Sequence, residues 1–146
     1  MTFSLYEIEE ATPPNQRSRW FWLVSPGSDP RMGLSEIGDR KADSLYQWMN
    51  VIASTPETAL LGKGKYRHIS SYDIEGWQFF ELKVKLPGKT DARFYLYRNS
   101  SPIEGGRLYD RHIVVYFASK EPRKRKANAD YEFARDAMIT RLEELQ

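Results

Sequence analysis

Lysines and arginines alternate with aromatic residues in the segment from Trp77 to Lys126, and these residue types could act together on an anion. A β-strand has a side-chain period of two, so the polar side chains of the strand at 78–86 share one face, as do those of the return strand after residue 91. If the two faces align, they form a cationic and aromatic surface made of Lys83, Lys85, Arg93, Tyr95 and Tyr97. Phosphates bind cations and bases stack on aromatic rings, so this surface predicts a nucleic-acid ligand.

The net charge of +2 is distributed unevenly along the chain. Residues 1–80 carry −2, residues 81–126 carry +7 and residues 127–146 carry −3. A basic segment in a nearly neutral protein indicates where an acidic partner would bind. The alternative is that the lysines only solvate the open face of a half-exposed sheet.

The composition excludes several kinds of site. The 146 residues, of which 40% are hydrophobic, suffice for the core of one domain. The absence of cysteine excludes disulfides, thiolate zinc sites and a cysteine nucleophile, and a total of two histidines argues against a histidine-rich metal site. We therefore expect no metal and no cofactor, and no motif indicates a small-molecule substrate.

The sequence contains no segment that indicates a membrane protein. No apolar run approaches the length of about 20 residues that crosses a bilayer. The N-terminus is acidic where a signal peptide would be basic. These features predict a soluble, cytoplasmic protein with no membrane partner.

Periodicity and turn residues predict the elements that would position the basic surface. They are a short strand at 3–8, a strand at 19–24, a helix from an N-cap at Ser35 to Pro56, a strand-like segment at 66–72, a hairpin at 77–98, a strand at 112–118 and a last helix. The last helix carries Tyr131, Ala134, Met138, Leu142 and Leu145 on one stripe. The order predicts an α+β fold, a mostly antiparallel sheet packed against a helix of the N-terminal half and a C-terminal helix. We divide the chain into an N-terminal strand or arm at 1–17 and a single domain at 18–146.

Other ionisable and aromatic residues receive structural roles. Glu81 lies on the face of the lysines and is expected to be their salt-bridge partner. His112 stands at the mouth of a strand and is expected to be a solvated loop-end histidine rather than an acid or base. The four tryptophans are expected to pack in the core or against the sheet.

Four segments, taken in order, resemble the RelE superfamily of toxins, and most of all its HigB or phage Gp49-like branch. They are Phe80–Lys85, Arg93–Tyr97, Ile113–Lys120 and Tyr131–Arg135. The resemblance extends from about Trp77 to Leu142 and implies a RelE-like fold for the domain. It implies a small toxin that enters the ribosomal A site and cuts mRNA there without a metal. It also implies a cognate antitoxin, expected to be a helix-turn-helix protein, that holds the toxin inactive.

In this superfamily the 2′-hydroxyl of the RNA attacks the adjacent phosphate, which requires a proton acceptor, cations and an acid for the leaving oxygen. The resemblance places Lys83 and Lys85 at the basic pair of the central strand, where one lysine would accept the proton while its neighbours stay charged. It places Arg93 at the arginine that opens the return strand and clamps a phosphate. Tyr95 or Tyr97 would stack on a base of the RNA. Tyr131 would act as an acid or base.

The chain departs from the HigB branch after Lys120. There it has a basic run that either contacts the RNA backbone or is a solvated link, made of Lys120, Arg123, Lys124, Arg125 and Lys126. The arm at 1–17 and the loop at 99–110 also exceed the compact pattern. Two hypotheses follow: a ribosome-dependent endoribonuclease toxin, or a non-catalytic RelE-like accessory factor of phage or mobile-element origin that binds nucleic acid or a protein.

Overall fold

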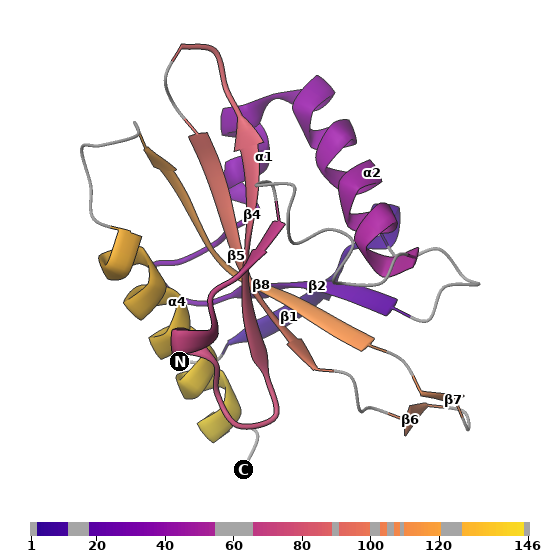
Figure 1. Cartoon of the computed structure of the whole chain (residues 1–146), viewed down its shortest axis with the longest axis vertical. Helices are drawn as coiled ribbons and strands as arrows, with labels where there is room; N and C mark the ends of the chain where they lie inside the picture. Colours follow the sequence, from indigo (N-terminus) through magenta and orange to yellow (C-terminus); the bar gives the residue numbers. More distant parts are fainter. Residues whose placement is uncertain are drawn as a thin grey trace.

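In the computed structural model, the chain forms a six-stranded sheet with helices on both of its faces (Figure 1). The structure describes residues 3–11, 18–54, 66–88, 91–99, 103–104, 107–108, 110–120 and 127–144. The prediction of an α+β fold with a mostly antiparallel sheet is confirmed.

The sheet has the strand order β1-β2-β8-β5-β4-β3. Its strands are β1 (Ser4–Glu7), β2 (Ser18–Val24), β3 (Tyr66–His68), β4 (Gln78–Lys85), β5 (Asp91–Asn99) and β8 (Asp110–Lys120). Neighbours are antiparallel except β2 and β8, which are parallel. The N-terminal strand β1 pairs with β2 and is therefore an edge of this same sheet.

The short elements lie in the connections. The 3-10 helices η1 (Glu9–Ala11) and η3 (Ser70–Tyr72) each occupy one turn. The strands β6 (Ile103–Glu104) and β7 (Arg107–Leu108) pair with each other, within the segment expected to be an irregular loop. The predicted hairpin is present as β4 and β5.

The helix predicted between Ser35 and Pro56 is divided into two helices. They are α1 (Met32–Ile37) and α2 (Asp39–Ser54), and Gly38 between them has a φ of 84°, which breaks the helical path. The prediction of Ser35 as an N-cap is wrong, because Ser35 lies inside α1 and its hydroxyl donates to the carbonyl of Met32 at 2.9 Å.

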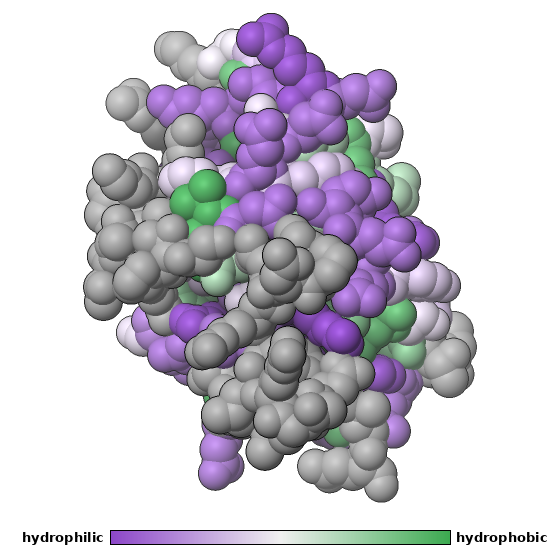
Figure 2. Space-filling model, turned by 90° about the vertical axis from the view of Figure 1, so that its right-hand side faces the viewer, coloured by the Kyte–Doolittle hydropathy of each residue, from purple (hydrophilic) through white to green (hydrophobic). Residues whose placement is uncertain are grey.

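One face of the sheet, called the α2 face, packs against α1 and α2. Its buried residues are almost all apolar, and they include Trp20, Trp22, Ile37, Leu45, Met49, Ile52, Phe80, Leu82, Phe94, Leu96 and Val114. Viewed from the side of α2, the described surface is mostly hydrophilic (Figure 2). The α2 face therefore consists of a buried apolar layer beneath a polar helix surface.

The other face, called the α4 face, packs against α4 (Ala127–Glu144). The predicted stripe of the last helix is confirmed for Tyr131, Ala134 and Met138, which are buried against the sheet, and Leu142 packs beside them. The sheet residues beneath the helix include Trp77, Phe79, Tyr95, Tyr97, Ile113 and Val115. The sheet is thus covered on both faces, and α4 supplies the second cover.

A bulge in β8 shapes the α4 face. The register with β5 shifts so that Tyr95 is opposite Tyr116 and Leu96 is opposite Val114, which leaves Val115 as the extra residue. Val115 and Tyr116 both join the apolar cluster of the α4 face. The bulge thereby brings the ring of Tyr116 to the side of the sheet where α4 lies.

Within the described part of the chain, no helix is long and apolar enough to cross a membrane.

Candidate RNA-binding site

The cross-strand register of β4 and β5 gathers the predicted cations at one end of the α4 face. Lys83 is directly opposite Arg93, and Lys85 is directly opposite Asp91. Direct partners on antiparallel strands point to the same face, with Cβ atoms about 4.5–5.5 Å apart. The predicted alignment of the lysines with Arg93 is therefore present. Lys83 is half-buried and Lys85 is exposed.

The prediction that Tyr95 and Tyr97 are exposed for base stacking is wrong. Both rings are fully buried beneath α4, because the alternation that places them beside Arg93 also places them under the helix. Burial raises the pKa of both hydroxyls well above the usual range of tyrosine, so both stay protonated. The Tyr97 hydroxyl donates to the carbonyl of Tyr72 at 2.9 Å, which fixes η3 against the sheet.

The carboxylate of Glu81 is buried where the apolar part of the α4 face meets its cationic end. Its side chain is 2% exposed, and its oxygens lie 3.4 Å from Arg93 Nη1 and 3.8 Å from Arg67 Nη2. The hydroxyl of Tyr131 donates to Glu81 Oε2 at 3.3 Å. A buried carboxylate needs such partners, since an uncompensated charge in the interior is strongly destabilising. The partners of Glu81 are thus arginines and a tyrosine, rather than the lysines that the sequence suggested.

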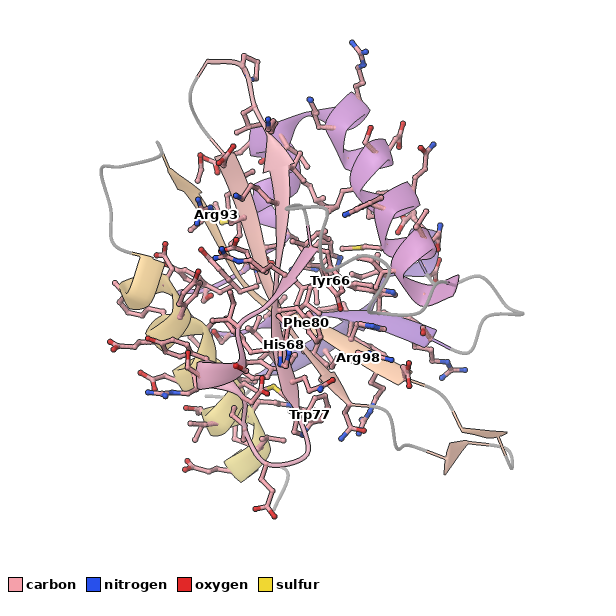
Figure 3. All side chains as sticks on the ribbon, viewed as in Figure 1. Tyr66, His68, Trp77, Phe80, Arg93 and Arg98 are labelled. Carbon is pink, nitrogen blue, oxygen red and sulfur yellow. The ribbon has the colours of Figure 1, made fainter. Side chains whose placement is uncertain are left out.

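Arg93 is held between two carboxylates. Its side chain is 13% exposed, and besides Glu81 it approaches Asp91, whose Oδ2 lies 3.8 Å from Nη2. Figure 3 shows Arg93 apart from Tyr66 and Phe80, whose stacked rings belong to the α2 face. The guanidinium is therefore oriented before any ligand arrives, and a planar cation fixed in this way suits a phosphate.

Arg67 is a member of the site that sequence reasoning missed. It lies on β3 directly opposite Glu81, and its Nη2 donates to the Tyr131 hydroxyl at 3.1 Å. Burial, followed by the nearby Glu81, raises the pKa of Tyr131, so its hydroxyl stays protonated at neutral pH. Arg67, Tyr131 and Glu81 thus connect β3, α4 and β4. The sequence shows Arg67 in a strand-like segment, but its position opposite Glu81 follows only from the register of β3 and β4.

The prediction for His112 is wrong. His112 is 1% exposed within β8, and its ring stacks on that of Trp20 at 4.2 Å with the planes at 8°. Burial, followed by the charge of Arg98, lowers the pKa of His112 to about 3. The imidazole is therefore neutral and belongs to the core of the α2 face. The prediction that the tryptophans pack in the core or against the sheet is confirmed.

The predicted downstream basic residues mostly fall outside the described part of the chain. The backbone of Lys120 pairs with Asp91 at the end of β8, which brings this strand end to the cationic end of the α4 face. Arg123, Lys124, Arg125 and Lys126 lie outside the described residues.

Among the described residues, no three His, Cys, Asp or Glu side chains form a group that could hold a metal ion.

Comparison with protein-family models, curated proteins and solved structures gives no match to the chain. The site must therefore be interpreted from its own chemistry. Its parts are two cations paired across neighbouring strands, two further cations beside them, and a buried carboxylate and phenol that hold the arginines in place. Such a constellation binds an anion with defined geometry.

Proposed function

We propose that the chain is a RelE-like toxin, an endonuclease that cuts mRNA in the ribosomal A site with the RNA 2′-hydroxyl as nucleophile and without a metal. The observation that carries this proposal is the direct pairing of Lys83 with Arg93, next to the Glu81 and Tyr131 contact. The order of basic and aromatic motifs along the chain supports the same function. A mostly antiparallel sheet with a helix from the N-terminal half on one face and the C-terminal helix on the other is compatible with a RelE-like fold.

We assign the phosphate to Arg93 and the two lysines. Arg93 donates two parallel hydrogen bonds to phosphate oxygens and stabilises the charge that develops as the 2′-oxygen attacks. Lys83 is its direct cross-strand partner, and Lys85 lies two residues further along the same face. One lysine accepts the proton of the 2′-hydroxyl as the 2′-oxygen bonds to phosphorus, and the other, which is charged, gives a proton to the 5′-oxygen as its bond to phosphorus breaks.

Glu81 and Tyr131 act on the site through other residues. Glu81 is too deeply buried to meet a substrate, so it serves as a positioning residue for Arg93. The Tyr131 hydroxyl is protonated and donates to Glu81, which suits a hydrogen-bond donor and not a base. We therefore propose that Tyr131 connects α4 to this network. To act as an acid, its hydroxyl would first have to break its hydrogen bond to Glu81.

The function is tested by induction of the chain in a bacterial host, with growth and mRNA integrity as readouts. The wild type is expected to arrest growth and to cut translated mRNA, whereas a Lys83→Ala, Lys85→Ala and Arg93→Ala triple variant is expected to do neither. Coexpression of an antitoxin from a neighbouring reading frame is expected to relieve the arrest. Arg40→Ala and Lys41→Ala on α2 are matched controls, because that helix covers the opposite face of the sheet. Absence of arrest by the wild type would sink the proposal.

One observation favours a second function, that of a non-catalytic RelE-like factor that binds nucleic acid or a protein. Arg93 already has two carboxylates within 4 Å, and a phosphate would have to compete with them. For such a factor, RNA binding that depends on Lys83 and Arg93 is expected without any cleavage. The induction experiment separates the two functions, because the factor would leave both growth and mRNA intact.

A further inference from the structure

Four aromatic rings form a continuous stack across the α4 face. The aromatic stack consists of Phe79 on β4, Tyr95 on β5, Tyr116 on β8 and Phe133 on α4. Successive ring centroids are 5.9, 6.1 and 5.9 Å apart, and successive ring planes differ by 6°, 24° and 21°. These separations and angles are those of offset-stacked aromatic pairs.

The aromatic stack runs from the core to the surface. Phe79 and Tyr95 are fully buried, Tyr116 is half-buried, and Phe133 is 62% exposed, the most exposed aromatic residue among those described. One face of the Phe133 ring lies on Tyr116, and the large exposed fraction leaves its other face open to solvent. The residues four positions before and after it on the helix are Ala129 and Ala137, whose side chains are too small to cover the ring. Those three positions away are Asp130, which is fully buried, and Asp136.

Tyr116, the ring on which Phe133 stacks, is a cross-strand neighbour of the candidate phosphate site. Tyr116 is directly opposite Tyr95, and the next pair on the same face of these two strands is Arg93 with Ala118. Diagonal neighbours on adjacent strands are about 7–8 Å apart, which is the separation expected between Arg93 and Tyr116, and the Phe133 ring lies 5.9 Å beyond the Tyr116 ring. Tyr116 therefore supports a ring platform beside the position where Arg93 would hold a phosphate.

We infer that Phe133 is the platform on which a base of the bound RNA stacks, the role predicted above for Tyr95 and Tyr97, which are buried. The inference rests on the proposed function for the presence of RNA. The occupant is a nucleobase of a single strand, because a base has two flat faces that fit an open stacked ring and the backbone that bears it carries phosphates for the cations of the site. Tyr95 and Tyr116 contribute by holding the Phe133 ring in the plane of the stack.

The test measures binding of the full-length chain to two oligomers by fluorescence anisotropy. One is a 2′-O-methylated adenosine oligomer of about eight nucleotides, which cannot be cut and matches the site size of single-strand binders. The other has the same length and phosphates but carries no bases. The wild type is expected to bind the base-bearing oligomer more tightly, and Phe133→Ala is expected to weaken that binding by about 5- to 150-fold while leaving the abasic oligomer unaffected.

Two further variants separate stacking from simple apolar contact. Phe133→Trp keeps a flat ring and is expected to retain the preference for bases, whereas Phe133→Leu keeps apolar bulk and is expected to lose it. The far-UV circular dichroism of all three variants should match the wild type, since the side chain is largely exposed.

Several outcomes overturn the inference. They are equal binding of both oligomers by the wild type, no binding of either, an unchanged preference in Phe133→Ala, and a loss that affects both oligomers equally. A change of oligomeric state in Phe133→Ala with unchanged RNA binding would assign the ring to a protein contact instead. Failure here is distinct from failure of the proposed function: mRNA cleavage by Phe133→Ala at the wild-type rate leaves the toxin proposal standing, and base-dependent binding without cleavage leaves the stacking inference standing.

Discussion

Each face of the sheet contains a buried ionisable residue, and the two residues differ in charge and in their partners. On the α2 face, His112 is stacked on Trp20, and its lowered pKa of about 3 keeps it neutral. On the α4 face, the equally buried carboxylate of Glu81 has arginine and tyrosine partners. The α2 face thus removes charge from its core, whereas the α4 face keeps charged partners together at its open end.

This difference indicates which face is scaffold and which carries function. Ionic groups in an interior are expensive to desolvate and seldom add net stability over apolar packing. A network that holds Arg93 in one orientation is therefore better explained by a ligand than by stability. The α2 face needs no such explanation, since its apolar residues account for the packing of α1 and α2.

The largest expected effect is on the α2 face. Phe94→Ala removes a fully buried ring between β5 and the helices and is expected to lower the free energy of unfolding by about 3–5 kcal/mol. Lys85→Ala, at an exposed position of the α4 face, is expected to change it by less than about 0.5 kcal/mol. Urea unfolding followed by tryptophan fluorescence measures both values. Similar values for the two variants would contradict the assignment of the scaffold to the α2 face.

The next effect is a pH dependence that belongs to the α2 face. The folded-state pKa of His112 is about 3 and its unfolded value is about 6.5, so the unfolded chain binds a proton that the folded chain does not as pH falls below 6.5. Stability is therefore lost with acidification, by about 2 kcal/mol between pH 7.5 and pH 5. In His112→Phe, which cannot titrate, this contribution should be absent. An identical pH profile for wild type and variant in urea unfolding would contradict the neutral buried state.

A pair of tyrosines on the α4 face gives a smaller effect. Tyr131→Phe and Tyr97→Phe each remove one buried hydroxyl, and each is expected to reduce stability by about 1 kcal/mol. They should differ in activity, because the hydroxyl of Tyr131 donates to the Glu81 network while that of Tyr97 donates to a backbone carbonyl. We expect slower mRNA cleavage by Tyr131→Phe and wild-type cleavage by Tyr97→Phe. Equal cleavage rates for the two variants would show that the hydrogen bond from Tyr131 to Glu81 does not affect cleavage.

The smallest effect is on the salt dependence of RNA binding. Removal of one phosphate contact from a single-strand complex reduces the slope of log K against log salt by about 0.7. We expect this reduction for Lys83→Ala at the open end of the α4 face and no change for Lys41→Ala on α2. Anisotropy titrations at several salt concentrations give both slopes, and equal slopes would move the anion site away from β4.

The alternation of side chains along β4 and β5 predicts that Lys83, Lys85 and Arg93 share one surface if the two polar faces align, and the register of the hairpin confirms this alignment. The pattern could not tell an open face from a covered one, because alternation assigns residues to faces without showing what packs on them. Alternation therefore predicts Tyr95 and Tyr97 on the surface, although α4 buries them. The apolar stripe of the last helix is evident in the sequence, but the sheet residues that it packs against are not.

Other features depended on contacts between segments that are distant in the chain. Arg67 joins the site only because β3 pairs with β4 in a register that places it opposite Glu81. The position of His112 at a strand end predicts a solvated histidine, whereas parallel pairing with β2 stacks it on Trp20. No sequence pattern singles out Phe133, because the ring on which it stacks, Tyr116, reaches the α4 face only through a bulge in β8.

The most direct test of the central claim, that the Lys83 and Arg93 pair acts on an RNA phosphate, is the chemistry of the product ends. Purified chain is incubated with programmed ribosomes in the presence of a chelator, and the cut mRNA is analysed by mass spectrometry. Attack by the 2′-hydroxyl predicts a 2′,3′-cyclic phosphate and a 5′-hydroxyl, with a rate reduced by about 100- to 1,000-fold in Arg93→Ala and unchanged in Arg40→Ala. Products that end in a 3′-hydroxyl and a 5′-phosphate, or wild-type cleavage by Arg93→Ala, would contradict it.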